Sequence, residues 1–163
     1  MASRRKQARA TTGRRSRAAD YPPAESCGYL VRDAHRAFQR LLEKRIAPFG
    51  VTRGQWYFLR VLWSQDGVSQ RELSERVGMM EPTTVIALRG MEKAGLIRRV
   101  RSADDKRKAQ VWLTAKAKRL RQRLLTLARR INAEALTGVT PTELATFRRA
   151  IAKMTANLDR IRQ

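Results

Sequence analysis

The stretch "SQRELSERVGMMEPTTVIALRGMEKAG", residues 69–95, decides the fold because it contains the start and end signals of two consecutive helices. Ser69 opens a capping-box pattern, and Gly78 is placed to end the helix that this pattern begins. Pro82 suits the first turn of a second helix, and Gly95 is placed to end it. The spacing therefore predicts a helix–turn–helix over this stretch.

A charged hairpin is expected directly after the two helices. Two short apolar runs, "GLIRRV" (95–100) and "QVWL" (110–113), are typical of strands, and "RSADDKRKAQVWLT" (101–114) carries the charges between them. A helix–turn–helix followed by such a hairpin is the arrangement of a winged helix–turn–helix. At the tip, Asp105 is placed to hold Arg107 in one orientation, which lowers the entropy lost when an arginine enters a narrow minor groove.

The segments on both sides of this lobe also predict helices. A helix is expected from the end of "DYPPAE" (20–25) to about Ala47, a second after Thr52, and a long third after Thr114. A further capping box, "TPTE" (140–143), precedes a seam of apolar residues spaced three and four apart, as in coiled coils. The candidate dimerisation residues are Leu30, Leu144, Phe147, Ile151, Met154 and Leu158.

The predicted fold is mainly α with a small β-hairpin wing, a winged helix–turn–helix lobe combined with an N- and C-terminal helical dimerisation region. We divide the chain into four parts. They are a disordered basic arm (1–22), a dimerisation helix (23–50), the DNA-binding lobe (51–113), and a long linker helix with the C-terminal dimerisation helix (114–163).

The charge of the chain predicts a polyanionic partner. Its 163 residues carry 36 Lys and Arg against 14 Asp and Glu, which gives a net charge of +22. Nucleic acid is the commonest partner of so basic a protein. We expect no membrane partner, because no apolar run approaches the ~20 residues needed to span a bilayer. The single cysteine, Cys27, excludes an internal disulfide and favours a cytoplasmic location.

Three stretches together resemble the MarR family of prokaryotic, dimeric winged-helix regulators. They are "VSQRELSERVG" (68–78), "EPTTVIALRGMEKAGLIRR" (81–99) and "DDKRKAQVWLT" (104–114), and the resemblance covers about residues 25–163. Members are usually repressors that small molecules release from DNA. The resemblance implies a homodimer on a palindromic operator of double-stranded DNA, a nucleoid-associated location, a small-molecule effector, and neither cofactor nor metal.

The resemblance also assigns the residues expected to contact DNA. Val85 and Ile86 depart from the polar residues that members often carry at these positions. Thr84 falls where members usually bury an apolar residue, so a place in the core is an open alternative for it. The candidate DNA-binding residues are Glu81, Pro82, Thr83, Thr84, Val85, Ile86, Arg89, Arg101, Asp105, Lys106, Arg107 and Lys108.

The expected effector is a small organic anion, an aromatic acid or its coenzyme A thioester. Aromatic side chains at the junction of the first helices can form flat apolar walls, and nearby arginines can meet carboxylate or phosphate groups. The alternative is ordinary core aromatics beside a solvated basic face. The candidate effector-binding residues are Arg32, His35, Arg36, Phe38, Gln39, Arg40, Trp56, Arg60 and Trp63.

Three other functions compete with that of a ligand-responsive repressor. An enzyme is not expected, because His35 is the only histidine and no catalytic or metal-ligating constellation is present. A nonspecific nucleic-acid packaging protein would fit the charge but would not need a recognition helix and a wing. A thiol-based peroxide sensor would use Cys27, as one branch of the family does, yet "AHRAFQRLLEK" (34–44) lacks the tyrosines of that branch.

Overall fold

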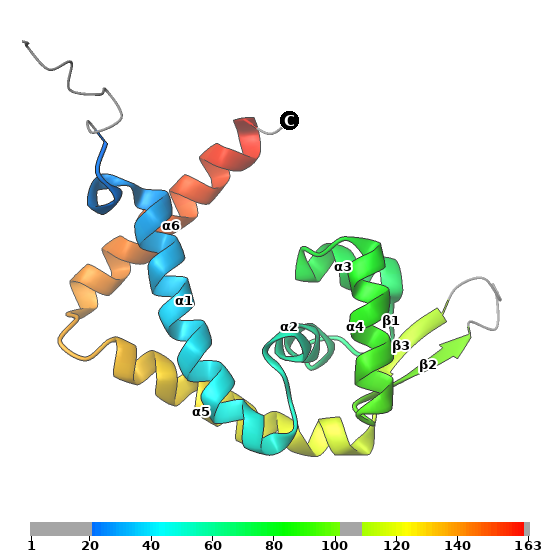
Figure 1. Cartoon of the computed structure of the whole chain (residues 1–163). Coiled ribbons are helices and arrows are strands. Elements are labelled where there is room, and N and C mark those ends of the chain that lie inside the picture. The colour runs from blue at the N-terminus through cyan, green and yellow to red at the C-terminus, as the bar shows by residue number, and fades with distance from the viewer. Residues whose placement is uncertain (1–20, 102–108, 162–163) are drawn as a thin grey trace, which may run out of the picture. The chain divides into compact units, whose positions relative to one another are not determined.

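The computed structural model describes residues 21–101 and 109–161, and the chain divides within its first long helix into two compact units, one ending at Ala37 and the other beginning at Phe38. The predicted mainly α fold with a small antiparallel sheet is confirmed (Figure 1). No helix within the described ranges is long and apolar enough to cross a membrane. The elements are η2 (Pro23–Glu25), α1 (Cys27–Ile46), η3 (Ala47–Phe49), α2 (Arg53–Leu62), β1 (Val68–Ser69), α3 (Gln70–Val77), α4 (Glu81–Lys93), β2 (Ile97–Arg101), β3 (Ala109–Leu113), α5 (Ala115–Ala135) and α6 (Pro141–Ile161).

The helix starts of the second unit follow the capping signals of the sequence, with one difference. Thr52 and Gln55 form the full capping box before α2, with N–H···O distances of 3.3 and 2.9 Å. Ser69 caps α3 by accepting a bond from the amide of Glu72 at 3.1 Å. The second bond of the expected capping box, from the amide of Ser69 to the Glu72 carboxylate, is not formed, and this carboxylate accepts a bond from Arg76 at 3.4 Å instead.

The wing hairpin belongs to a sheet of three antiparallel strands in the order β1-β3-β2. Strands β2 and β3 pair from Ile97 opposite Leu113 to Arg101 opposite Ala109. The sequence did not predict β1, which pairs Val68 with Val111, because a strand of two residues is too short to show an alternating pattern.

The core of the lobe is formed by α2, α3, α4, the sheet and the beginning of α5. Figure 1 shows α2, α3 and α4 gathered beside the sheet, while α5 continues from the end of β3. Trp63 donates a hydrogen bond from its indole Nε1 to the carbonyl of Ala117 at 3.1 Å, which fixes the end of α2 against α5. The fully buried large residues include Phe58, Leu59, Leu73, Leu88, Met91, Leu96, Val111 and Leu124.

The turn between α2 and β1 ties the wing to the rest of the lobe. Asp66 Oδ1 accepts bonds from the amides of Gly67 at 3.1 Å and Leu113 at 2.8 Å, and its Oδ2 lies 3.1 Å from Lys118 Nζ. Gly67 adopts φ +74°, and a Cβ there would lie 2.5 Å from the indole ring of Trp112. Only glycine therefore fits at this position.

The last two helices differ in how much of their apolar surface is covered. Helix α5 begins at the cap Thr114 and buries Ala117, Leu124 and Ile131. Helix α6 begins with the predicted capping box, in which Thr140 N–H donates to Glu143 at 2.8 Å, and this bond holds the pKa of Glu143 below its usual range. No residue of α6 is buried in the single chain.

Candidate nucleic-acid interface and ligand cavity

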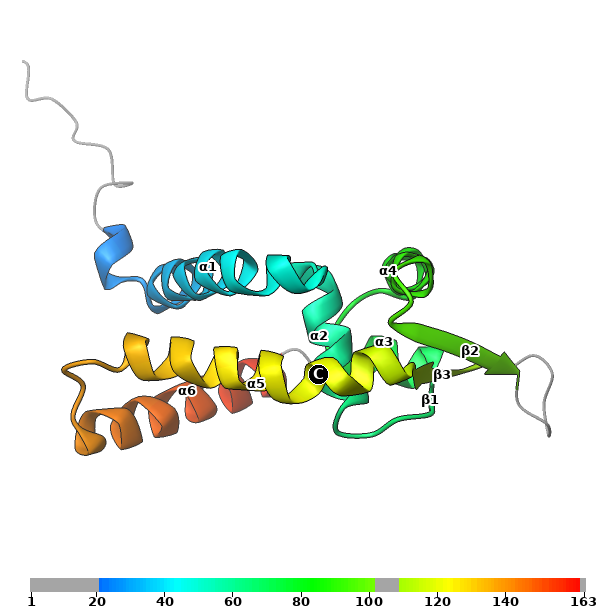
Figure 2. The same cartoon turned by 90° about the horizontal axis from the view of Figure 1, so that it is seen from below.

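Helix α4 has one face in the core and an opposite face in solvent. Its buried residues Thr84, Leu88 and Met91 are spaced four and three apart, so they lie on one side of the helix. Pro82 stands in the first turn, where its missing N–H leaves no helical bond unmade. Figure 2 shows α4 nearly end-on, beside strand β2.

The exposed face of α4 combines polar and apolar side chains. Thr83, Ile86 and Arg89 follow one another at intervals of three residues, so they lie together on this face, and all three are exposed. Ile86 is 70% exposed, and Met80, directly before the helix, is 72% exposed. Glu81 and Pro82, also predicted to contact DNA, are exposed in the first turn.

One predicted DNA-contacting residue of α4, Thr84, does not lie on this face. Thr84 has no exposed surface, and its hydroxyl donates to Ser74 Oγ at 3.1 Å, while Ser74 donates to the carbonyl of Met79 at 2.6 Å. The assignment of Thr84 to DNA is therefore wrong, and the core alternative is correct. Its hydroxyl is tolerated there because it is hydrogen-bonded. Val85, four residues before Arg89, is half-buried.

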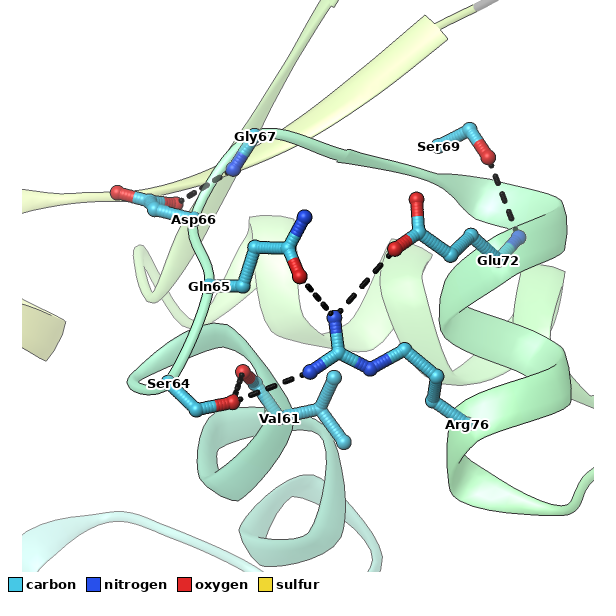
Figure 3. Close-up of polar contacts among 8 residues, drawn as sticks. All are labelled: Val61, Ser64, Gln65, Asp66, Gly67, Ser69, Glu72 and Arg76. Carbon is cyan, nitrogen blue, oxygen red and sulfur yellow. Dashed lines mark hydrogen bonds and ion pairs between the residues drawn. The ribbon is translucent and has the colours of Figure 1, made fainter.

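Helix α3 is held in place by Arg76, which reaches back to the end of α2. The guanidinium donates to Gln65 Oε1 at 2.8 Å, to Ser64 Oγ at 3.2 Å and to Glu72 at 3.4 Å. Figure 3 shows these three bonds converging on one side chain, while Asp66 points away from it toward the sheet. The turn after α2 thus contacts α3 on one side and the wing strand on the other.

The wing is described for its two strands, β2 and β3. The predicted DNA contacts Asp105, Lys106, Arg107 and Lys108 lie outside the described residues, and of Arg101 only the backbone is described. At the base of the wing, Arg99 binds Glu92 of α4 with an N···O distance of 2.5 Å. This hydrogen bond from Arg99 holds the pKa of Glu92 below its usual range, so the pair stays ionised and joins α4 to β2.

A cavity of about 670 Å³ lies between α2, α5 and α6. Four arginines from these three helices line it, together with Trp63 and Ser64, and no acidic residue is among its lining residues. The arginines are Arg60, Arg121, Arg129 and Arg148. Glu134 lies close in sequence but is already held by Arg45 through bonds of 3.0 and 2.6 Å, which lower the pKa of this carboxyl. The cavity is therefore strongly positive.

The cavity contains two of the nine predicted effector-binding residues, Arg60 and Trp63. Trp56 does not line it, and its ring packs edge-to-face against that of Trp63, with the two ring centroids 5.8 Å apart. Phe38, Gln39 and Arg40 are also not among its lining residues, and Gln39 instead donates to the Tyr57 hydroxyl at 3.2 Å. The remaining candidates, Arg32, His35 and Arg36, belong to the first unit of the chain.

Sequence reasoning missed three of the four arginines of the cavity. Arg121 and Arg129 are eight residues apart on α5, on the same side as Leu125, and this helical spacing was the available signal. Arg148 comes from α6, and no sequence pattern links it to α2.

Cys27, the candidate redox residue, is exposed at the start of α1. The described residues contain no cluster of side chains able to hold a metal ion.

Comparisons with known proteins agree with this arrangement. The profile of the MarR family matches residues 49–108. The transcriptional regulator PA3341 is 31% identical, with a TM-score of 0.73 over 83% of this chain and 99% of that one. The transcriptional repressor CouR, solved with a 23-mer DNA duplex, is 26% identical, with a TM-score of 0.70 over 83% of this chain and 94% of its own. PcaV from Streptomyces coelicolor, solved with its natural ligand, is 26% identical, with a TM-score of 0.71 over 83% of this chain and 95% of its own.

Proposed function

Because the chain belongs to the MarR family of DNA-binding transcriptional regulators, we propose that it is a homodimeric repressor that leaves a palindromic operator when a small organic anion binds. The observation that carries this proposal is the cavity lined by four arginines and no acid. A guanidinium binds a carboxylate through two parallel charge-assisted hydrogen bonds. Trp63 offers a flat apolar wall beside these cations, which favours an aromatic acid or its coenzyme A thioester.

The dimer is supported by the uncovered apolar stripe of α6. Phe147 is 60%, Leu158 is 65% and Ile161 is 82% exposed in the single chain, at the spacing typical of a coiled-coil seam. Large apolar side chains in such a row usually mark a protein interface. A two-fold dimer would read two half-sites about one helical turn, ~10 bp, apart.

The DNA contacts are proposed for the exposed face of α4 and for the wing. Thr83 and Arg89 would reach base edges in the major groove, where an arginine can pair with guanine. Arg107, oriented by Asp105, would enter the minor groove, whose negative potential attracts cations. This proposal is supported by the similar repressor CouR, whose structure was solved with a bound DNA duplex.

The effector is tested by adding benzoate and benzoyl-CoA to the full-length protein and measuring both thermal unfolding and the anisotropy of a labelled operator. Benzamide, which has the same shape as benzoate without its charge, is the matched control. We expect the anions to raise the unfolding temperature and release the operator, and benzamide to do neither. Stabilisation by neutral or cationic compounds alone would contradict the proposal.

A variant pair tests whether the cavity is the binding site. Arg121→Gln removes one lining cation, and Arg123→Gln removes a cation of the same helix that does not line the cavity. We expect Arg121→Gln to weaken binding of the anion on the order of tenfold, as the loss of a charge-assisted hydrogen bond does. Equal effects of the two substitutions would show that only the general positive charge of α5 matters.

A further inference from the structure

Helix α4 exposes one large aliphatic side chain in the middle of its solvent face. Ile86 is 70% exposed, whereas Leu88 and Met91 of the same helix have no exposed surface. An isoleucine in this position gains nothing from the fold, since it lies opposite the buried residues of the helix. It is flanked on the same face by Thr83 and Arg89, so any surface that covers it must also suit a hydroxyl and a cation.

The major groove of DNA offers one apolar group of the right kind. Thymine alone among the four bases carries a methyl group there, whereas the other base edges present hydrogen-bond donors and acceptors. An isoleucine side chain forms no hydrogen bond, so it cannot distinguish these polar edges by pairing with them. It can distinguish thymine, because packing of Ile86 against the methyl group removes apolar surface of both from water.

We propose that Ile86 is a specificity-determining residue, which selects thymine at one position of each operator half-site through contact with its C5-methyl group. The proposal rests on the proposed function, because it requires α4 to enter the major groove. DNA is favoured over a protein partner as the occupant because Arg89 stands next to Ile86 and the whole chain carries a charge of +22. Val85, the neighbouring β-branched residue, is half-buried and is assigned no such role.

The test compares thymine with deoxyuridine, which pairs with adenine in the same way and lacks only the methyl group. Full-length protein first selects its preferred sequence from a random duplex pool. That duplex is then made again with deoxyuridine at one symmetric pair of thymines at a time. At one pair, we expect the affinity of the wild type to fall on the order of tenfold, because each of the two missing methyl groups weakens binding about fourfold.

Two variants of α4 complete the test. Ile86→Ala should bind the thymine and deoxyuridine duplexes equally, while Val85→Ala should keep the preference of the wild type for thymine. Ile86→Val, which retains a β-branched side chain, should keep part of the preference. Because Ile86 is exposed, substitutions at this position should leave the circular dichroism spectrum unchanged.

Each other outcome overturns the proposal in a distinguishable way. If deoxyuridine changed the affinity at no position of the selected sequence, the role of Ile86 would be contradicted and the proposed function would still stand. The same would follow if Ile86→Ala kept the thymine preference, or if it changed the oligomeric state instead. A pool from which no sequence is enriched would contradict both this proposal and sequence-specific repression.

Discussion

The winged lobe and helix α6 are both built from amphipathic helices, but only the lobe covers its apolar surface within one chain. Phe58, Leu73 and Leu88 have no exposed surface, whereas Phe147 and Leu158 of α6 are 60% and 65% exposed. A periodic pattern therefore indicates which side of a helix must be buried, and does not say which molecule buries it. The comparison predicts that substitutions of buried residues in the lobe act on folding and that substitutions in the apolar stripe of α6 act on association.

The largest effect is expected at Gly67. The substitution Gly67→Ala forces a side chain into a backbone with φ +74° and places a Cβ 2.5 Å from the ring of Trp112. The strain of the left-handed conformation and the overpacking together should lower the free energy of unfolding by about 3 kcal/mol. Urea unfolding followed by far-ultraviolet circular dichroism measures this loss.

The matched control is Gly138→Ala in the turn before α6. Gly138 has φ +81°, but a Cβ there would meet no atom within 4 Å. Only the backbone strain remains, so the expected loss is about 1 kcal/mol. Equal losses at the two glycines would mean that Trp112 moves aside freely and that the wing base is less firmly packed than the structure indicates.

The second effect concerns association. Phe147→Ser removes the exposed ring of α6 and should raise the dissociation constant of the proposed dimer on the order of 30-fold, or ~2 kcal/mol, as the loss of a central aromatic anchor does. Sedimentation equilibrium over a range of protein concentrations measures the change. Lys153→Ser, which replaces an exposed cation of the same helix outside the apolar stripe, should leave the dissociation constant nearly unchanged.

A wild-type protein that remains monomeric at micromolar concentration would break the comparison, because α6 would then expose its stripe without a partner. The comparison would also be weakened if Phe147→Ser lowered the free energy of unfolding of the monomer. In that case the stripe would also support the fold of its own chain.

The smallest effect is expected for the ion pair between Glu92 and Arg99, which are each 31% exposed. The hydrogen bond from Arg99 lowers the pKa of Glu92 in the folded chain, so the unfolded chain binds a proton more readily. The pair therefore contributes stability above the ordinary pKa of glutamate, and this contribution is lost as the pH falls through the lowered value. Glu92→Gln should destabilise the lobe by less than about 1 kcal/mol at pH 7.

Unfolding of the wild type and Glu92→Gln at several pH values checks this sign. The difference should persist from pH 7 to 5 and shrink below about pH 4, because the glutamate of the unfolded chain then takes up a proton more readily than the paired one. Glu75→Gln, which breaks the more exposed pair with Arg71 inside α3, serves as the control and should change stability less. If the difference in free energy of unfolding between the wild type and Glu92→Gln grew as the pH fell, the pKa of Glu92 would be raised in the folded chain rather than lowered.

Local signals in the sequence predicted local structure well. The caps Thr52, Thr114 and Thr140 stand where their patterns placed them, because a capping bond joins residues only three apart. Ser69 Oγ accepts the predicted bond from the amide of Glu72, but the Glu72 carboxylate accepts a bond from Arg76. Which donor a carboxylate binds depends on the positions of all nearby side chains, and the spacing of the capping box alone does not predict it.

The arginine-lined cavity, the candidate effector site, was the part least accessible to sequence reasoning. Its lining comes from three helices and the residues at their ends, and of the two core tryptophans Trp63 lines the cavity and Trp56 does not. Trp56 lies within α2, whereas Trp63 directly follows its last residue and donates to the carbonyl of Ala117 in α5. The position of Arg148 depends on the path of the chain after α5. Neither property follows from helical periodicity.

The cavity and the exposed face of α4 have no residue in common, since the cavity is lined by α2, α5 and α6. Mutations that alter one set of side chains therefore leave the other set chemically intact. If both proposals hold, a duplicated copy of this protein can change its operator through the exposed positions of α4 and keep its effector, or do the reverse. The same separation would let an engineer transplant the outer face of α4 to redirect the regulator to a new promoter.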